Sequence, residues 1–315
     1  MLQYLIILLD ETSTSFCHYN IPPNQSPKGE VGKRLMSLEI LKKGIRYGMM
    51  ENLMIQYVYP DYDLPEEYAK VIESIDHSKI KPIKEGADVW VTESIKDVQS
   101  EMPVVWRTDF KQMLESEPVI IEALDNVPRL NIVLTDVDGF AEEDFTAYKA
   151  LLERLSVKIE QMYKNGKAPQ LNMLTDRIML NKMNNCGAGS SSITLAPNGK
   201  FYVCPAFYYE DESDSIGNLV NGLDIKNEQL YKIEYAPICR HCDAFQCKRC
   251  IWLNRKTTLE VNTPSHEQCV VAHLERNASR ELLRNIRKHG VFLPEQEDIK
   301  ELDYLDPFDI VNRWQ

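Results

Sequence analysis

Residues 239–250 read CRHCDAFQCKRC and hold four cysteines within one short segment. Cys186 and Cys204 precede this group and Cys269 follows it, so seven of the eight cysteines lie in the second half of the chain. Thiols at such short spacings are typical ligands of soft metals. The sequence therefore predicts a metal-binding module in this part of the protein.

The first two of these cysteines flank a predicted hairpin. Segments 192–195 and 200–203 surround the turn Pro197-Asn198-Gly199, and Cys204 follows Gly199 after four residues. The next sixty or so residues are rich in Cys, Asp and Tyr and show little periodicity. Such a segment buries little apolar surface, so ligand bonds would contribute much of its folding free energy.

Two kinds of metal site are compatible with the cysteine spacing. An iron–sulfur cluster needs about four thiolates around one cube, and C-x2-C places two sulfurs on the same side of a tight turn. Paired C-x2-C knuckles also bind zinc. The short gap between Cys242 and Cys247 leaves little room for two facing knuckles, which favours a cluster, but thiolate spacing alone does not identify the metal.

The N-terminal segment 2–9 is apolar but short, and it meets Asp10 without a basic run or a cleavage site. We expect it to be a buried strand. No apolar stretch approaches the roughly 20 residues that cross a bilayer, so we expect a cytoplasmic protein with no membrane partner. Thiols stay reduced in that compartment, which argues against disulfides.

The net charge of −12 argues against nucleic acid as a partner, because phosphate backbones would be repelled. One predicted helix, 267–289, carries Arg276, Arg280, Arg284 and Lys288 at intervals of four. Its opposite face is apolar. We therefore interpret the basic stripe as the solvated side of an amphipathic helix.

The first 185 residues alternate between strand-like and helical segments, which indicates a parallel sheet with helical crossovers. About six βα units are expected, so the predicted fold class is α/β with a partial (β/α)6 barrel. Strands are predicted at 2–9, 53–59, 87–92, 103–106, 130–134 and 171–174, and helices at 31–49, 64–75, 110–124, 142–164 and 176–184.

The segment from Cys186 to Cys269 resembles a SPASM domain, the auxiliary-cluster module that follows the barrel of radical SAM enzymes. The match includes Gly199-x4-Cys204 and Gly217-Asn218-Leu219, whereas the gaps of four and two in the central group are one shorter than is common in that family. The resemblance implies two [4Fe-4S] clusters of the auxiliary type. Their ligands would be Cys186, Cys204 and Cys250 for the first, and Cys239, Cys242, Cys247 and Cys269 for the second.

The radical SAM family binds its catalytic cluster through C-x3-C-x2-C after the first strand. Here Asp10 and Thr14 occupy two of those positions and only Cys17 fits. The family's Gly-Gly-Glu loop after the second strand is replaced by residues 59–63, YPDYD. The resemblance thus implies a radical SAM-like barrel without its radical chemistry, and S-adenosylmethionine is not expected as a cofactor.

Segments 2–10 and 15–19, taken with the cysteine module, are similar to the CXXX repeat peptide maturases. The resemblance implies a protein that binds a cysteine-containing precursor peptide beside a separate, intact radical SAM enzyme. Two alternatives remain: a peptide-modifying enzyme that uses an auxiliary cluster as Lewis acid or electron relay, and a zinc-stabilised interaction scaffold. The expected domains are the barrel 1–185, the iron–sulfur module 186–272, and a C-terminal helix with an acidic tail, 273–315.

Other motifs are weaker. Residues 135–139, TDVDG, look like the nucleophile motif of haloacid dehalogenase-type phosphatases, but the downstream sheet of that fold is missing and Phe140 stands where Thr is usual. We expect Asp136 and Asp138 to end a strand and cap the next helix. His241 lies inside the cysteine group and is expected at the surface or behind the ligands. No catalytic residue is predicted.

Overall fold

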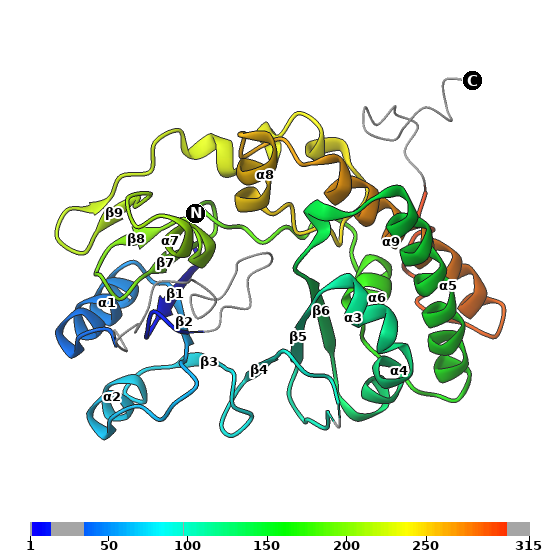
Figure 1. Cartoon of the computed structure of the whole chain (residues 1–315), viewed down its shortest axis with the longest axis horizontal. Coiled ribbons are helices and arrows are strands. Elements are labelled where there is room, and N and C mark those ends of the chain that lie inside the picture. The colour runs from blue at the N-terminus through cyan, green and yellow to red at the C-terminus, as the bar shows by residue number, and fades with distance from the viewer. Residues whose placement is uncertain (1, 14–34, 97, 301–315) are drawn as a thin grey trace. The chain divides into compact units, whose positions relative to one another are not determined.

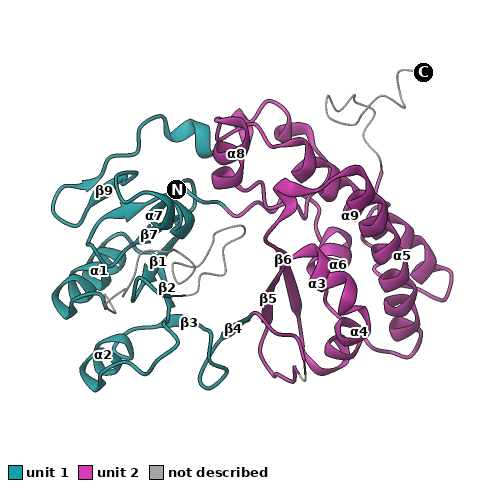
Figure 2. Cartoon of the chain, in the orientation of Figure 1, with its two compact units in different colours: residues 1–92, 187–232 teal, residues 93–186, 233–315 magenta. Residues whose placement is uncertain are grey.

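The computed structural model describes residues 2–13, 35–96 and 98–300. The chain folds into two compact units, each assembled from two distant segments (Figure 2). Unit 1 comprises residues 1–92 and 187–232, and unit 2 comprises residues 93–186 and 233–315. Cys17 and Thr14, which the sequence places at the predicted cluster loop, lie outside the described residues.

Unit 1 is built on a mostly parallel sheet in which β1 is central. The strand order is β4-β3-β2-β1-β7-β8, and neighbours run parallel except for β7 and β8, which form the predicted hairpin. The bounds are β1 Tyr4–Leu8, β2 Met54–Val58, β3 His77–Lys81, β4 Val89–Thr92, β7 Ser192–Leu195 and β8 Phe201–Tyr202.

One helix of unit 1 approaches this sheet unusually closely. A methyl group on Gly44 would lie 2.3 Å from Leu195 Cδ2, and one on Gly48 would lie 2.8 Å from Ile55 Cδ1. These glycines let helix and sheet backbones come near one another. This helix is α1 (Leu38–Met50). Unit 1 also contains the helices α2 (Glu66–Ile72) and α7 (Pro205–Glu210), the short strands β9 (Gly217–Asn218) and β10 (Gly222–Leu223), and the 3-10 helix η3 (Glu228–Tyr231).

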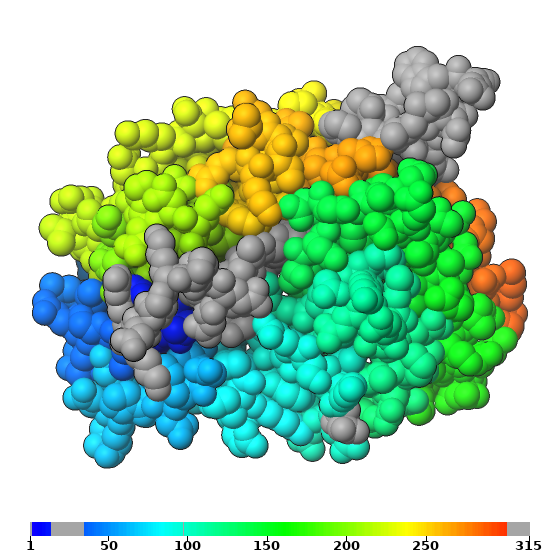
Figure 3. Space-filling model, viewed as in Figure 1, coloured from blue at the N-terminus to red at the C-terminus, as the bar shows by residue number. Residues whose placement is uncertain are grey.

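Unit 2 places helices against a parallel strand pair. α6 packs on both β6 and α9, and α5 lies along α9 (Figure 1); the outer side of α5, in green, is at the surface (Figure 3). The elements are β5 (Val104–Thr108), α3 (Phe110–Glu115), α4 (Glu117–Asn126), β6 (Leu130–Leu134), η2 (Val137–Gly139), α5 (Glu142–Lys164), α6 (Asn172–Met179), η4 (Ile233–Tyr235), η5 (Cys239–His241), α8 (Ile251–Thr258) and α9 (His266–Arg287). None of the described helices is long and apolar enough to span a bilayer.

Most predicted strands are confirmed, and the differences have local causes. Residues 77–81 form β3 although their sequence, HSKIK, is polar and lacks a strand pattern. The predicted helix 110–124 is broken into α3 and α4 at Ser116, beside the proline at the start of α4. A loop rather than a helix joins β3 to β4, so the regular βα alternation is wrong there.

The predicted strand 171–174 is also wrong. Leu171 makes only an isolated bridge to Leu130, and α6 begins at the next residue. Asn172 instead bonds the edge of β6, accepting from Ile132 N–H at 2.9 Å and donating to Ile132 O at 2.9 Å. The helix predicted at 176–184 is the continuation of α6 and ends at Met179.

A buried ionic network fixes the cysteine-rich loop to α9 in unit 2. Arg276 Nη1 donates to Asp243 Oδ1 at 2.6 Å, and both side chains are nearly inaccessible to solvent. Arg177 Nε donates to Asp243 O at 2.7 Å while its guanidinium lies 4.2 Å from the centre of the Phe245 ring. Because an unpaired charge at this depth would be costly, the residue after Cys242 has little freedom to move.

A second network in unit 2 centres on a buried carboxyl group. Glu275 Oε1 accepts from Tyr148 OH at 2.7 Å, and Oε2 accepts from Gln246 Nε2 at 3.3 Å. Burial raises the pKa of Glu275 to about 7, partly offset by the two hydrogen bonds and increased by nearby Asp176. Gln246 also donates to Ala272 O at 2.7 Å, which ties the loop to α9 a second time.

Replacing Gly44 with leucine should destabilise unit 1. The added side chain must enter space that Leu195 and Ile7 already fill, and overpacking of this kind costs about 1–3 kcal/mol. Urea unfolding of Gly44→Leu should show this loss, whereas Lys42→Leu, which introduces the same side chain on the exposed face of α1, should change stability little. Equal stabilities of the two variants would contradict the close packing of α1.

Glu275 should make stability fall as the pH rises. Its folded pKa of about 7 lies above the usual value of 4.5, so its contribution is fully present below pH 4.5 and is lost through pH 7, by up to about 3 kcal/mol. Glu275→Gln cannot ionise and should therefore gain stability relative to the wild type between pH 5 and pH 8. Urea unfolding at both pH values checks this, and exposed Glu281→Gln should leave the pH dependence unchanged. Parallel wild-type and Glu275→Gln curves would contradict the shifted pKa.

Candidate metal centre

Tight turns bring the central cysteines together. Cys242 N–H donates to Cys239 O at 3.1 Å, and Cys247 N–H donates to Ala244 O at 2.9 Å. Arg249, between Cys247 and Cys250, has a φ of 46°, a left-handed conformation that costs a non-glycine residue about 1–2 kcal/mol. Strain of this kind is maintained only where the surrounding structure requires it, and here it directs the chain between two predicted ligands.

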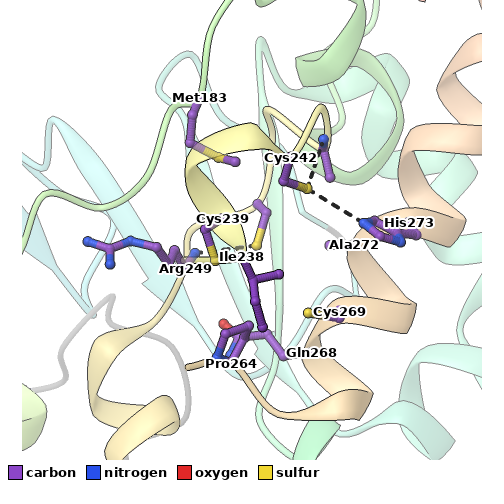
Figure 4. Close-up of a pocket in the computed structure, with 12 residues that line it drawn as sticks. Met183, Ile238, Cys239, Cys242, Arg249, Pro264, Gln268, Cys269, Ala272 and His273 are labelled. Atoms are coloured by element: carbon purple, nitrogen blue, oxygen red, sulfur yellow. Dashed lines mark hydrogen bonds between the residues drawn. The ribbon is translucent and has the colours of Figure 1, made fainter. Parts of the chain in front are cut away.

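The four cysteines predicted for the second cluster line one pocket of unit 2. Cys239, Cys242 and Cys247 come from the loop, and Cys269 comes from the first turns of α9. Figure 4 shows the labelled side chains of Cys239, Cys242 and Cys269 around the same space. The structure thus brings together the members of this predicted group.

Nitrogen donors point at two of the sulfurs. Ala244 N–H donates to Cys242 Sγ at 3.4 Å, and Arg249 N–H donates to Cys247 Sγ at 3.4 Å. His273 Nε2 lies 3.5 Å from Cys242 Sγ (Figure 4). Hydrogen bonds to sulfur stabilise the thiolate form and orient metal ligands.

Burial opposes the charged form of these thiols in the absence of metal. The pKa of Cys247 is raised well above its usual value, first by burial and then by Cys239 and Cys242. A cation is needed to hold several thiolates in such a place, because metal ions deprotonate coordinating thiols outright. The all-sulfur donor set suits zinc or iron–sulfur chemistry.

The arrangement differs from a site for one ion. A zinc ion with four Zn–S bonds of about 2.3 Å would hold its sulfurs about 3.8 Å apart. Among the residues that the structure describes, no three His, Cys, Asp or Glu side chains are grouped closely enough to hold a single ion. The four thiols instead surround a shared space.

The cysteines predicted for the first cluster belong to both units. Cys186 and Cys250 are in unit 2, where Cys186 N–H donates to Lys248 O at 3.1 Å and Cys250 N–H donates to Gln268 Oε1 at 3.0 Å. Cys204 is a buried residue of unit 1 and directly precedes α7. The convergence of these three sulfurs stays a prediction.

In unit 1, side-chain hydrogen bonds hold the described start of the loop after β1. Asp10 is inaccessible to solvent; its Oδ1 accepts from Thr12 N–H at 2.7 Å and its Oδ2 accepts from Tyr62 OH at 2.7 Å. Ser13 Oγ donates to Val58 O at 3.0 Å. Burial, together with Asp10, raises the pKa of Tyr62, which keeps its hydroxyl protonated as a donor.

Two tyrosines of α7 contact the same loop. Tyr209 OH donates to Ser13 O at 2.6 Å, and Tyr208 OH donates to Glu11 Oε1 at 3.2 Å. Burial followed by the Glu11 charge raises the pKa of Tyr208, so it too stays a donor. These contacts within unit 1 give both side chains a structural role that no motif in the sequence revealed.

The weaker sequence candidates have structural explanations. Asp136 accepts Phe110 N–H at 3.1 Å, so its side chain bonds the first turn of α3 beside the N-cap Asp109 and does not cap the helix that follows it. Asp138 Oδ2 accepts from Lys256 Nζ at 2.9 Å. His241 is exposed, as expected, and the histidine beside the sulfurs is His273. Its position four residues after Cys269 on one helix face was the signal that could have identified it.

Comparison with known proteins gives a structural match only. No protein-family model matches the chain, and no curated protein matches it. A hexahistidine-tagged form of anSMEcpe with bound AdoMet has a TM-score of 0.58 at 14% identity, covering 91% of this chain and 96% of that one. Native anSMEcpe with bound AdoMet and Cp18Cys peptide gives 0.57 at 13% identity, covering 91% and 100%.

At such low identity the match establishes the fold. The predicted fold class is confirmed: the chain has an α/β fold with a mostly parallel sheet, and its fold resembles that of anSMEcpe.

Proposed function

We propose that this chain is an iron–sulfur protein of ribosomal peptide maturation, of the CXXX repeat peptide maturase type. It binds and positions a cysteine-containing precursor, and a separate, intact radical SAM enzyme performs the radical chemistry. The match to anSMEcpe, one structure of which holds a Cp18Cys peptide, is consistent with peptide recognition on this fold.

The observation that carries the proposal is the shared pocket of Cys239, Cys242, Cys247 and Cys269. These four thiols would hold one [4Fe-4S] cluster, with each sulfur on a different iron. The N–H groups on Cys242 and Cys247 suit the negative charge of a ligated cluster.

The three remaining cysteines of the module form the second proposed ligand group. Cys186, Cys204 and Cys250 would hold the other auxiliary cluster, leaving one iron without a protein thiolate from this motif. An open iron supplies a Lewis-acid position for a soft ligand such as a peptide thiolate. Cys186 is the exposed member of the three, which is consistent with access from solvent.

The loss of S-adenosylmethionine chemistry is supported by the network after β1. At the position of the radical SAM family's first cluster ligand, this chain has Asp10. Its carboxylate oxygens already accept hydrogen bonds from Thr12 and Tyr62. Ser13 and Tyr209 fix the following residues. A hydrogen-bonded carboxylate thus stands at the position of the family's first thiolate ligand, and loss of these hydrogen bonds would leave a buried carboxylate unpaired.

Metal analysis tests the clusters directly. After anaerobic reconstitution we expect iron and acid-labile sulfide in equal amounts, and Cys247→Ser should lose about four of each per chain because its cube lacks a ligand. Cys17→Ser, outside the cysteine module, should keep the wild-type content. A colourless protein that binds zinc and no iron would favour the interaction scaffold instead.

Peptide binding tests the role. A synthetic peptide of Cys-x-x-x repeats should bind the cluster-loaded chain more tightly than the apo chain, and a Ser-x-x-x peptide should not show this difference. Incubation with the loaded chain, AdoMet and a reductant should leave the peptide mass unchanged and release no 5′-deoxyadenosine. A mass change with this chain alone would support the enzyme alternative, and no binding in either state would exclude precursor positioning.

A further inference from the structure

The side chain of His273, which lies outside the predicted ligand set, contacts a sulfur of the pocket. Its Nε2 lies 3.5 Å from Cys242 Sγ, and the ring lines the same pocket (Figure 4). The contact joins α9 to the loop, since the two residues come from different elements of unit 2. With its hydrogen on Nε2, the ring donates to sulfur.

The position of this ring is fixed from both sides. The residue before it, Ala272, accepts a hydrogen bond from Gln246 at 2.7 Å. Three residues after it, Arg276 forms the buried pair with Asp243 at 2.6 Å. Gln246 and Asp243 belong to the same loop as Cys242. These two neighbouring hydrogen bonds therefore hold the His273 ring at its distance from the sulfur.

The same sulfur also receives Ala244 N–H at 3.4 Å. Donors on a ligating sulfur stabilise negative charge, and a cluster carries more negative charge when it is reduced. Such hydrogen bonds therefore favour the reduced state and raise the reduction potential. A donor on a side chain, unlike one on the backbone, can be removed by substitution.

We propose that His273 is a positioning residue that donates a hydrogen bond to Cys242 Sγ and thereby raises the reduction potential of the cluster held by Cys239, Cys242, Cys247 and Cys269. The inference rests on the proposed function, because it requires that cluster. On this proposal His273 adjusts the reduction potential of the cluster, while the four cysteines alone hold the iron.

The test is a redox titration of reconstituted protein at constant pH, followed by electron paramagnetic resonance. His273→Phe should keep the wild-type iron and sulfide content but lower the reduction potential of the cluster. A tenfold change in the one-electron equilibrium constant corresponds to a shift of about 59 mV. His273→Gln keeps an N–H donor and should recover part of the shift. His241→Phe, which replaces an exposed histidine of the same segment, should leave the potential unchanged.

Other outcomes overturn the inference in distinguishable ways. Equal potentials in iron-loaded wild type and His273→Phe would remove the tuning role. Selective loss of iron in every folded His273 variant would make the histidine a ligand, which also contradicts the proposal. If His273→Phe does not fold, His273→Ala removes the donor without added bulk and carries the same expectation. Wild-type protein that takes up no iron would overturn the proposed function itself.

Discussion

Four thiols that share one pocket, one buried and three partly buried, are the constraint on which unit 2 depends. Water solvates their charge poorly there, so the ionised forms need positive charge from another source. The raised pKa of Cys247 follows from burial and from this crowding by Cys239 and Cys242. On our proposal iron provides the compensating charge, and binding of the metal and folding of the loop then become one thermodynamic event.

Helix α9 connects that loop to the rest of unit 2. It contributes the predicted ligand Cys269, the ring of His273, the buried carboxyl of Glu275 and the charge of Arg276 within a few turns. The sequence suggested only an amphipathic helix with a solvated basic face. Arg276, however, points inward, because Asp243 supplies a buried partner that no helical pattern could reveal.

The spacing of the cysteines predicted a metal-binding module, because short ligand spacing reflects chemistry that acts locally. The resemblance to a SPASM domain grouped Cys239, Cys242, Cys247 and Cys269, and these four residues line one pocket. Neither could reveal Tyr62, whose partner Asp10 is distant in the chain. The strand β3 was missed because its residues are mostly polar. They form a strand through pairing with β2 and not through their own strand propensity.

The predicted first domain ended at residue 185, yet β7 begins after that point and is the direct neighbour of β1. A fragment that stopped at the expected boundary would expose one full edge of the central strand of unit 1, with unpaired N–H and C=O groups beside the apolar side chains of Leu5 and Ile7. Such an edge is a template for pairing with other chains. During synthesis, therefore, this edge of β1 stays open to pairing with other chains until residues 192–195 emerge from the ribosome.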